Sequence, residues 1–172
     1  MTHAIYTRTL GFLVGLLLAS CQPQSLTPPV IDPTVPTRPV EHVMGTTPVP
    51  LSPERVVVID TTPLDAALAL GISPVGTIRY GAPPGYLDDV VKEIAVVGEY
   101  NQPNLETILR LEPDLILGAK SISERLYPRL SQIAPTVFIE GFGRNWDWKN
   151  NFRIFAEALG RSEQAEVLLA DY

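Results

Sequence analysis

Residues 55–65 read RVVVIDTTPLD, and this stretch decides the fold of the chain. Its four β-branched residues, Val56 to Ile59, are typical of a strand that is buried on both faces. Thr62 is the predicted N-cap of the helix that follows, with Pro63 in the first turn and Asp65 three positions after the cap. A buried strand that passes directly into a capped helix begins a strand–helix–strand unit, so the stretch predicts an α/β domain.

The same alternation continues along the rest of the chain. Further strands are predicted at 74–78, 94–97, 115–117 and 136–139. Predicted helices begin after Asn104, at a capping box of Ser121 and Glu124, at about Trp146 with an end at Gly160, and at Ser162. We expect Pro128 to shorten or kink the second of these helices. The pattern predicts a doubly wound parallel sheet, in which ligands bind beyond the carboxyl ends of the strands.

The front of the chain has the layout of a secretory leader. Arg8 precedes ten apolar or small residues at 10–19, which are too few to span a bilayer. Leu18-Ala19-Ser20-Cys21 resembles a bacterial lipobox, in which the cysteine is acylated. We therefore expect residues 1–20 to be a lipoprotein signal peptide and Cys21 to be the lipid attachment point. The expected location is extracytoplasmic, anchored by lipid to the cell membrane or on the periplasmic face.

Residues 21–50 are predicted to be a Pro-rich tether, because they hold eight of the 17 prolines. The exception is 40–45, where alternation predicts a short edge strand. His42 in this strand is expected to be solvated rather than a ligand. The folded body then begins at about residue 51, which leaves one domain's length of chain.

The composition excludes several kinds of site. The 172 residues carry 13 basic and 19 acidic side chains, for a net charge of −6, which argues against nucleic acid as a partner. A single cysteine cannot form an internal disulfide. His3 and His42 are the only imidazoles, so a His/Cys metal cluster cannot be built and no metal site is predicted.

Cations and aromatic residues gather in the loops that follow the predicted strands. Guanidinium and ammonium groups pair with oxyanions, and aromatic faces stack on flat groups. An anionic, flat ligand would suit this edge, although polar loops and aromatic residues of a helix core would look the same. The candidate ligand-binding residues are Arg79, Tyr80, Tyr100, Lys120, Arg144 and Trp146.

Enzymatic interpretations find less support. The sequence has no P-loop and no nucleophile elbow, and the Gly141-Phe142-Gly143 motif has Trp146 where a dinucleotide site needs a third glycine. Neither histidine is placed to act as the base of a hydrolytic triad. We expect no enzyme activity; a small lipid-anchored α/β enzyme, with Asp60 as a residue to test, stays open as an alternative.

Several phrases of the body together resemble one family. These phrases are Pro53–Asp60, Leu68–Gly76, Pro103–Ile108 and Leu111–Leu117. They are similar to the ferric-siderophore substrate-binding proteins of ABC importers, a group that includes vitamin B12 and haem binders. The resemblance implies two α/β lobes of the periplasmic-binding-protein fold, bridged by a long helix. In this chain residues 51–160 would form the N-terminal lobe and 161–172 the start of the interlobe helix, with the second lobe absent.

The resemblance also implies a function. The ligand would be a preformed Fe(III)-siderophore chelate, with no cofactor, and the partners an ABC permease with its ATPase. Arg79, Tyr100 and Lys120 would face the ligand, and Glu106 would dock the permease. A corrinoid or haem remains an alternative cargo. A monomer is expected, and a truncated product with one lobe would bind its chelate weakly or not at all.

Overall fold

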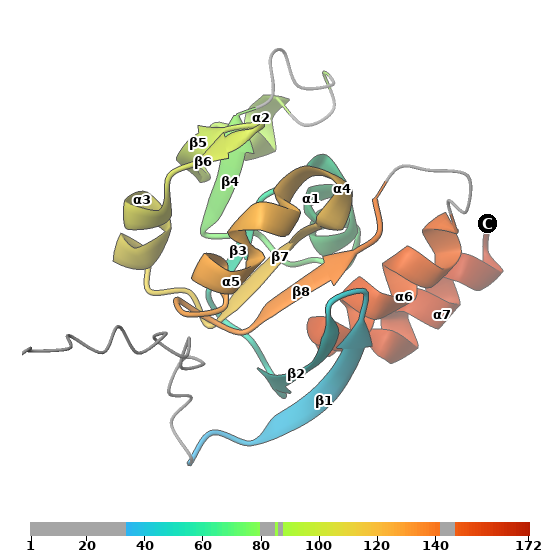
Figure 1. Ribbon diagram of the computed structural model, residues 1–172. Helices are drawn as coiled ribbons and strands as arrows, with labels where there is room; N and C mark the ends of the chain where they lie inside the picture. The colour runs from blue at the N-terminus through green and yellow to red at the C-terminus, as the bar shows by residue number, and fades with distance from the viewer. Residues whose placement is uncertain (1–33, 80–84, 86–87, 142–146) are drawn as a thin grey trace, which may run out of the picture.

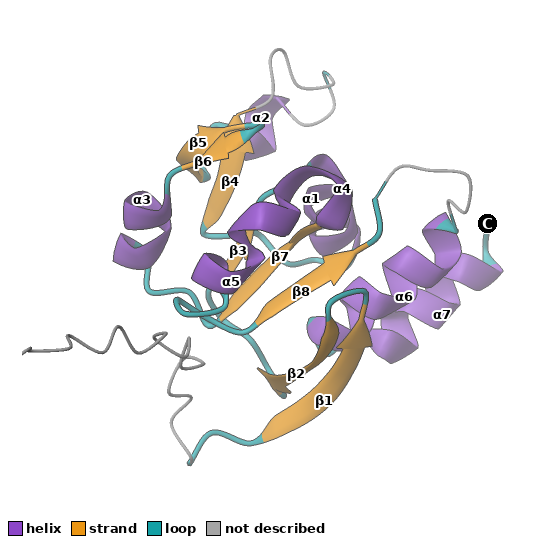
Figure 2. Ribbon diagram, in the orientation of Figure 1, coloured by secondary structure: helices purple, strands orange, loops and turns teal. Residues whose placement is uncertain are grey.

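The computed structural model describes residues 34–79, 85, 88–141 and 147–172. A six-stranded sheet forms its centre, in the spatial order β6-β5-β4-β3-β7-β8 (Figures 1 and 2). Five strands are parallel: β3 (Val56–Val58), β4 (Gly76–Arg79), β5 (Ala95–Glu99), β7 (Leu115–Ala119) and β8 (Thr136–Ile139). The short β6 (Gln102–Pro103) pairs antiparallel with β5 and was not predicted. Because the first strand of the sheet is central and the chain builds outward on both sides of it, the predicted doubly wound α/β fold is confirmed.

Helices pack on both faces of the sheet, each over its own apolar cluster. One face carries α1 (Thr61–Ala69), α6 (Trp148–Ala158) and α7 (Ser162–Ala170). The other carries α3 (Leu105–Arg110) and α5 (Tyr127–Leu130). The remaining helical segments are α2 (Asp88–Val91), α4 (Lys120–Ser123) and the 3-10 turn η1 (Glu124–Leu126).

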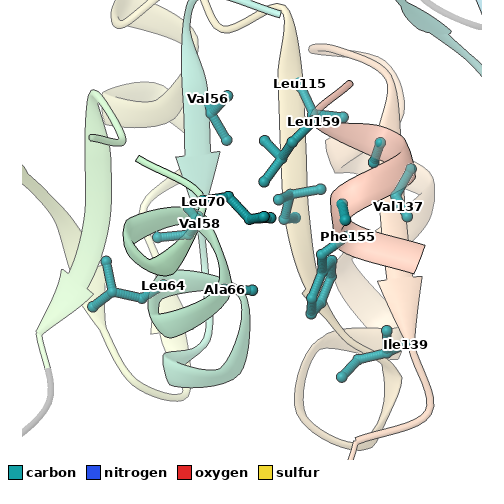
Figure 3. Packing of buried hydrophobic residues seen from close by; sticks show 14 of the residues in the cluster. Val56, Val58, Leu64, Ala66, Leu70, Leu115, Val137, Ile139, Phe155 and Leu159 are labelled. Atoms are coloured by element: carbon teal, nitrogen blue, oxygen red, sulfur yellow. The ribbon is translucent and has the colours of Figure 1, made fainter. Parts of the chain in front are cut away.

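The alternation of side chains along β3 builds both clusters at once. Val56 and Val58 point to the cluster under α1 and α6, whereas Val57 and Ile59 belong to the opposite cluster. Figure 3 shows Phe155 of α6 and Leu70, the C-cap of α1, packed against the strands of the first cluster. Burial of one such side chain stabilises the fold by roughly 1.5–3 kcal/mol, so these two layers fix the positions of the loops at the strand ends.

The structure corrects several predicted helix starts. The N-cap of α1 is Asp60, not Thr62, and its carboxylate accepts from the Thr62 N–H at 3.0 Å. The predicted capping box of Ser121 and Glu124 is wrong, because α4 begins at Lys120 without a side-chain cap. The break expected from Pro128 is confirmed, since Pro128 lies in the first turn of the separate helix α5. The other starts and ends agree to within two residues.

A β-hairpin replaces the last part of the predicted tether. Strands β1 (Thr37–His42) and β2 (Gly45–Pro50) pair antiparallel. Val40 and Val49 are fully buried in the cluster under α6, so residues 37–50 belong to the folded body. Pro39 lies opposite Pro48, and an isolated two-stranded ribbon tolerates these missing donors where a central strand would not. The high proline content therefore led to a predicted start of the folded body, at about residue 51, that is too late in the sequence.

His42 joins this hairpin to the sheet. Its Nδ1 accepts from the N–H groups of Phe138 and Met44, both at 3.3 Å, and its Nε2 lies 2.8 Å from the Thr47 hydroxyl. The side chain is half-buried, and burial lowers its pKa. The prediction of a solvated residue is therefore wrong.

Candidate ligand-binding site

The strand order indicates that a ligand would bind at the edge of the sheet formed by the carboxyl ends of its parallel strands. The chain leaves β3 toward β4 on one side and later returns to β7 on the other side of β3. The strand order therefore reverses between the adjacent strands β3 and β7. In open parallel sheets, ligands bind in the crevice beyond the carboxyl ends of the strands at this point. Asp60 comes two residues after β3, Arg79 ends β4, and Lys120 and Glu140 directly follow β7 and β8 at this edge.

A cleft of about 580 Å³ opens beside this edge. One wall is the turn from β5 into β6, and the other is the segment formed by α4 and η1. The described residues that line it are Asn101, Gln102, Pro103, Lys120, Ser121, Ile122, Glu124, Arg125 and Leu126. The structure thus places one predicted ligand residue, Lys120, in a cleft with amide and hydroxyl groups.

Two of the predicted cations lie at the edge in weak ion pairs. Lys120 Nζ is 3.8 Å from Glu140 Oε2, and its side chain is 31% exposed. Arg79 pairs with Glu99 at 3.4 Å, with both side chains largely exposed. Exposed pairs of this kind contribute about 0–1 kcal/mol, so an anionic ligand can replace either carboxylate at little cost.

The other predicted ligand residues divide into two groups. Tyr100 is half-buried and packs against the apolar cluster that holds Val97 and Ile108. Tyr80, Arg144 and Trp146 lie outside the described residues, as does Cys21.

Arg125, Asn101 and Gln102 line the cleft and were missed from the sequence. In one continuous α-helix, residues 120 and 125 would point about 140° apart, which follows from roughly 3.6 residues per turn. The chain is not one continuous helix here, because Ser123 between α4 and η1 departs from helical dihedrals with φ −119° and ψ 14°, and Lys120 and Arg125 both line the cleft. Pro128 signals a broken helix here, but a broken helix does not by itself indicate where the side chains of 120–126 point.

Asp60 is a buried carboxyl group at the point where the strand order reverses. Only 1% of the residue is exposed, and its Oδ1 caps α1. Its Oδ2 has no hydrogen-bond partner among the described residues. Burial raises the pKa of Asp60. The group acts as a helix cap and does not line the cleft.

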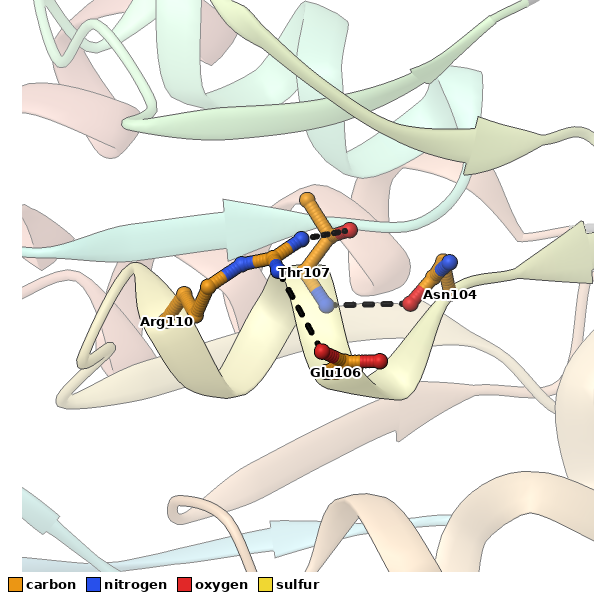
Figure 4. Close-up of polar contacts among 4 residues, drawn as sticks. All are labelled: Asn104, Glu106, Thr107 and Arg110. Atoms are coloured by element: carbon orange, nitrogen blue, oxygen red, sulfur yellow. Dashed lines mark hydrogen bonds and ion pairs between the residues drawn. The ribbon is translucent and has the colours of Figure 1, made fainter.

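Glu106 stands on the exposed first turn of α3 (Figure 4). Asn104 caps this helix by accepting from the Thr107 N–H at 3.0 Å, which confirms the predicted cap. Glu106 is 78% exposed and lies 3.3 Å from Arg110, whose other nitrogen donates to the Thr107 hydroxyl. The carboxylate is therefore accessible, and its partner is a weak helical pair.

The described ranges contain no group of three or more His, Cys, Asp or Glu residues arranged to hold a metal ion. None of their helices is long and apolar enough to cross a membrane.

Comparison with known proteins gives a consistent set of relatives. The probable siderophore-binding lipoprotein YfiY of Bacillus subtilis (strain 168) is 41% identical over 140 residues, which are 79% of this chain and 42% of that protein. The achromobactin-binding periplasmic protein of Dickeya dadantii (strain 3937) is 34% identical over 123 residues, 70% of this chain and 39% of the relative.

Solved structures agree with these relatives. The crystal structure of Staphylococcus aureus SirA complexed with staphyloferrin B matches with a TM-score of 0.72 and 36% identity, over 79% of this chain and 47% of SirA. The chain spans somewhat less than half the length of these relatives. The periplasmic binding protein family matches residues 56–172. The chain therefore belongs to the periplasmic binding protein family.

Proposed function

We propose that this chain forms the N-terminal lobe of an extracytoplasmic substrate-binding protein of an ABC importer, and that the lobe binds a preformed ferric siderophore. The observation that carries the proposal is the cationic carboxyl edge of the sheet, where Lys120 lines an open cleft and Arg79 lies two strands away. The printed names of the relatives, which include siderophore-binding and achromobactin-binding proteins, support this ligand class.

The chemistry of such a ligand fits the residues at the edge. A siderophore supplies the iron ligands itself, so the protein needs groups that bind a charged complex and no ligands for bare metal. Lys120 and Arg79 offer charge-assisted hydrogen bonds, and Asn101 and Ser121 offer neutral donors beside Lys120. Binding of this kind involves no bond making or breaking, so we propose a transport function without enzyme activity.

Delivery and anchoring complete the proposal. Glu106 is proposed to dock the lobe on an arginine of the permease, because its exposed carboxylate has only the weak Arg110 pair to give up. Cys21 is proposed as the lipid attachment point that keeps a monomeric protein at the outer face of the cell membrane. The ATPase of the importer would act from the other side of that membrane.

Solution NMR of the full chain tests the ligand and its place together. Gallium(III) replaces iron in siderophores without paramagnetic broadening, so chelates of carboxylate, hydroxamate and catecholate type can be titrated into isotope-labelled protein. We expect weak, saturable shifts of the amide signals at Lys120, Ser121 and Asn101. An absence of shifts with every chelate, or shifts confined to α6 and α7, would overturn the proposal.

A further inference from the structure

One cation of the cleft has no ion-pair partner among the described residues. Lys120 lies beside Glu140, and Arg79, Lys92, Arg110 and Arg153 each pair with a carboxylate as well. Arg125 lines the cleft, and no described residue forms an ion pair or a hydrogen bond with it. An unpaired guanidinium at the wall of a cleft keeps all of its donors for a ligand.

The side chains of the cleft walls indicate more closely which chemical class of ligand the cleft suits. The guanidinium fork matches the two oxygens of a carboxylate, which accept parallel hydrogen bonds from it. The amides of Asn101 and Gln102 and the hydroxyl of Ser121 add donors for carboxylate and hydroxyl oxygens. Among the described residues of the lining no aromatic side chain offers a face for a catechol ring. Glu124 also lines the cleft, and its charge limits how many carboxylates can enter.

We infer that Arg125 is a specificity-determining residue that binds a free carboxylate of the chelate, so the cleft selects hydroxycarboxylate-type over catecholate-type ferric complexes. This inference rests on the proposed function, because it names the ligand class of the same cleft. Arg125 would hold the ligand from the η1 side of the cleft, and Lys120 would hold it at the end of β7.

The test compares two arginines in the full chain. Arg125→Ala removes the unpaired cation from the cleft. Arg129→Ala removes an exposed arginine one helical turn further on, which has no ion pair with any described residue and does not line the cleft. Both variants change the net charge equally, and neither removes a buried side chain. The probes are the gallium(III) complexes of citrate and of catechol, titrated by NMR at the Asn101 and Ser121 amides.

We expect the wild-type chain to bind the citrate complex more tightly than the catechol complex. Loss of the Arg125 guanidinium is expected to weaken citrate binding about tenfold, the size typical of a lost charged hydrogen bond. Arg125→Lys should lie between wild type and Arg125→Ala, because lysine keeps the charge and loses the fork. Arg129→Ala should bind as the wild type does.

The possible failures are distinguishable. Preference for the catechol complex, or equal effects of the two alanine variants on citrate binding, would overturn the inference and leave the proposed function standing. If neither complex shifts any amide of the wild-type chain, the inference fails, and the proposed function fails with it only when a gallium(III) hydroxamate chelate also shifts none. Thermal unfolding of each variant identifies any loss of binding that comes from loss of fold.

Discussion

Asp60 shows how one residue can look catalytic and act as structure. Its buried carboxylate caps α1, and its raised pKa means that burial of the charge costs stability. We predict that Asp60→Ala lowers the free energy of unfolding by about 1 kcal/mol, the usual cost of a lost N-cap. Asp60→Asn keeps an oxygen for the Thr62 N–H without the charge, so it should be at least as stable as wild type near neutral pH.

The pH dependence provides the check on Asp60. A carboxyl group whose pKa is raised in the folded state contributes stability at low pH that is lost as the pH rises through the folded pKa. The difference in free energy of unfolding between wild type and Asp60→Asn, measured with urea, should therefore narrow as the pH is lowered toward the folded pKa of Asp60. An asparagine variant that unfolds as easily as the alanine variant would show that the cap is not the role of this side chain.

At the scale of elements, the hairpin of β1 and β2 has a pH-sensitive attachment. His42 Nδ1 can accept from the Phe138 N–H only while that nitrogen is unprotonated. Because burial lowers the pKa of His42, its contribution to stability is present above the unfolded value of about 6.5 and is lost as the pH falls through the folded pKa.

We predict that the amides of β1 and β2 exchange with solvent faster at pH 5.5 than at pH 7.5, after correction for intrinsic exchange rates. Hydrogen exchange followed by NMR measures this, with the amides of β7 as the internal reference. His42→Gln, which keeps an acceptor that does not titrate, should remove the difference. Equal acceleration in β1 and β7 would point to global unfolding and contradict a local role of His42.

The elements also show what sequence reasoning can reach. Apolar runs predicted all five parallel strands. For β3, β7 and β8 the reason is that a strand buried on both faces must be apolar on both faces, whereas β5 is largely exposed. Proline content predicts a tether over most of the hairpin, with an edge strand only at 40–45, since this content describes solvation and the burial of Val40 and Val49 depends on distant α6. The cleft was predicted in part: Lys120 follows a strand, whereas Arg125 lies in the η1 turn, whose geometry no local pattern specified.

At the scale of the whole molecule, a net charge of −6 works against an anionic ligand, so local fields must decide binding. Glu140 and Glu99 hold the two cations of the carboxyl edge, and a ligand must displace them or bear their repulsion. Glu140→Gln frees Lys120 from this competition. We predict that it tightens binding of the gallium citrate complex about two- to fivefold, which corresponds to the worth of an exposed ion pair.

Glu157→Gln separates the local effect from the change in net charge. Glu157 is exposed on α6, outside the cleft, and both variants shift the net charge from −6 to −5. If net charge governs binding, the two variants will tighten it equally; if the Lys120 pair governs it, only Glu140→Gln will. The gain should also shrink in about 0.5 M salt, because screening shortens the reach of charges to a few ångströms. Equal affinities of wild type and Glu140→Gln at low salt would mean that Lys120 does not meet the ligand.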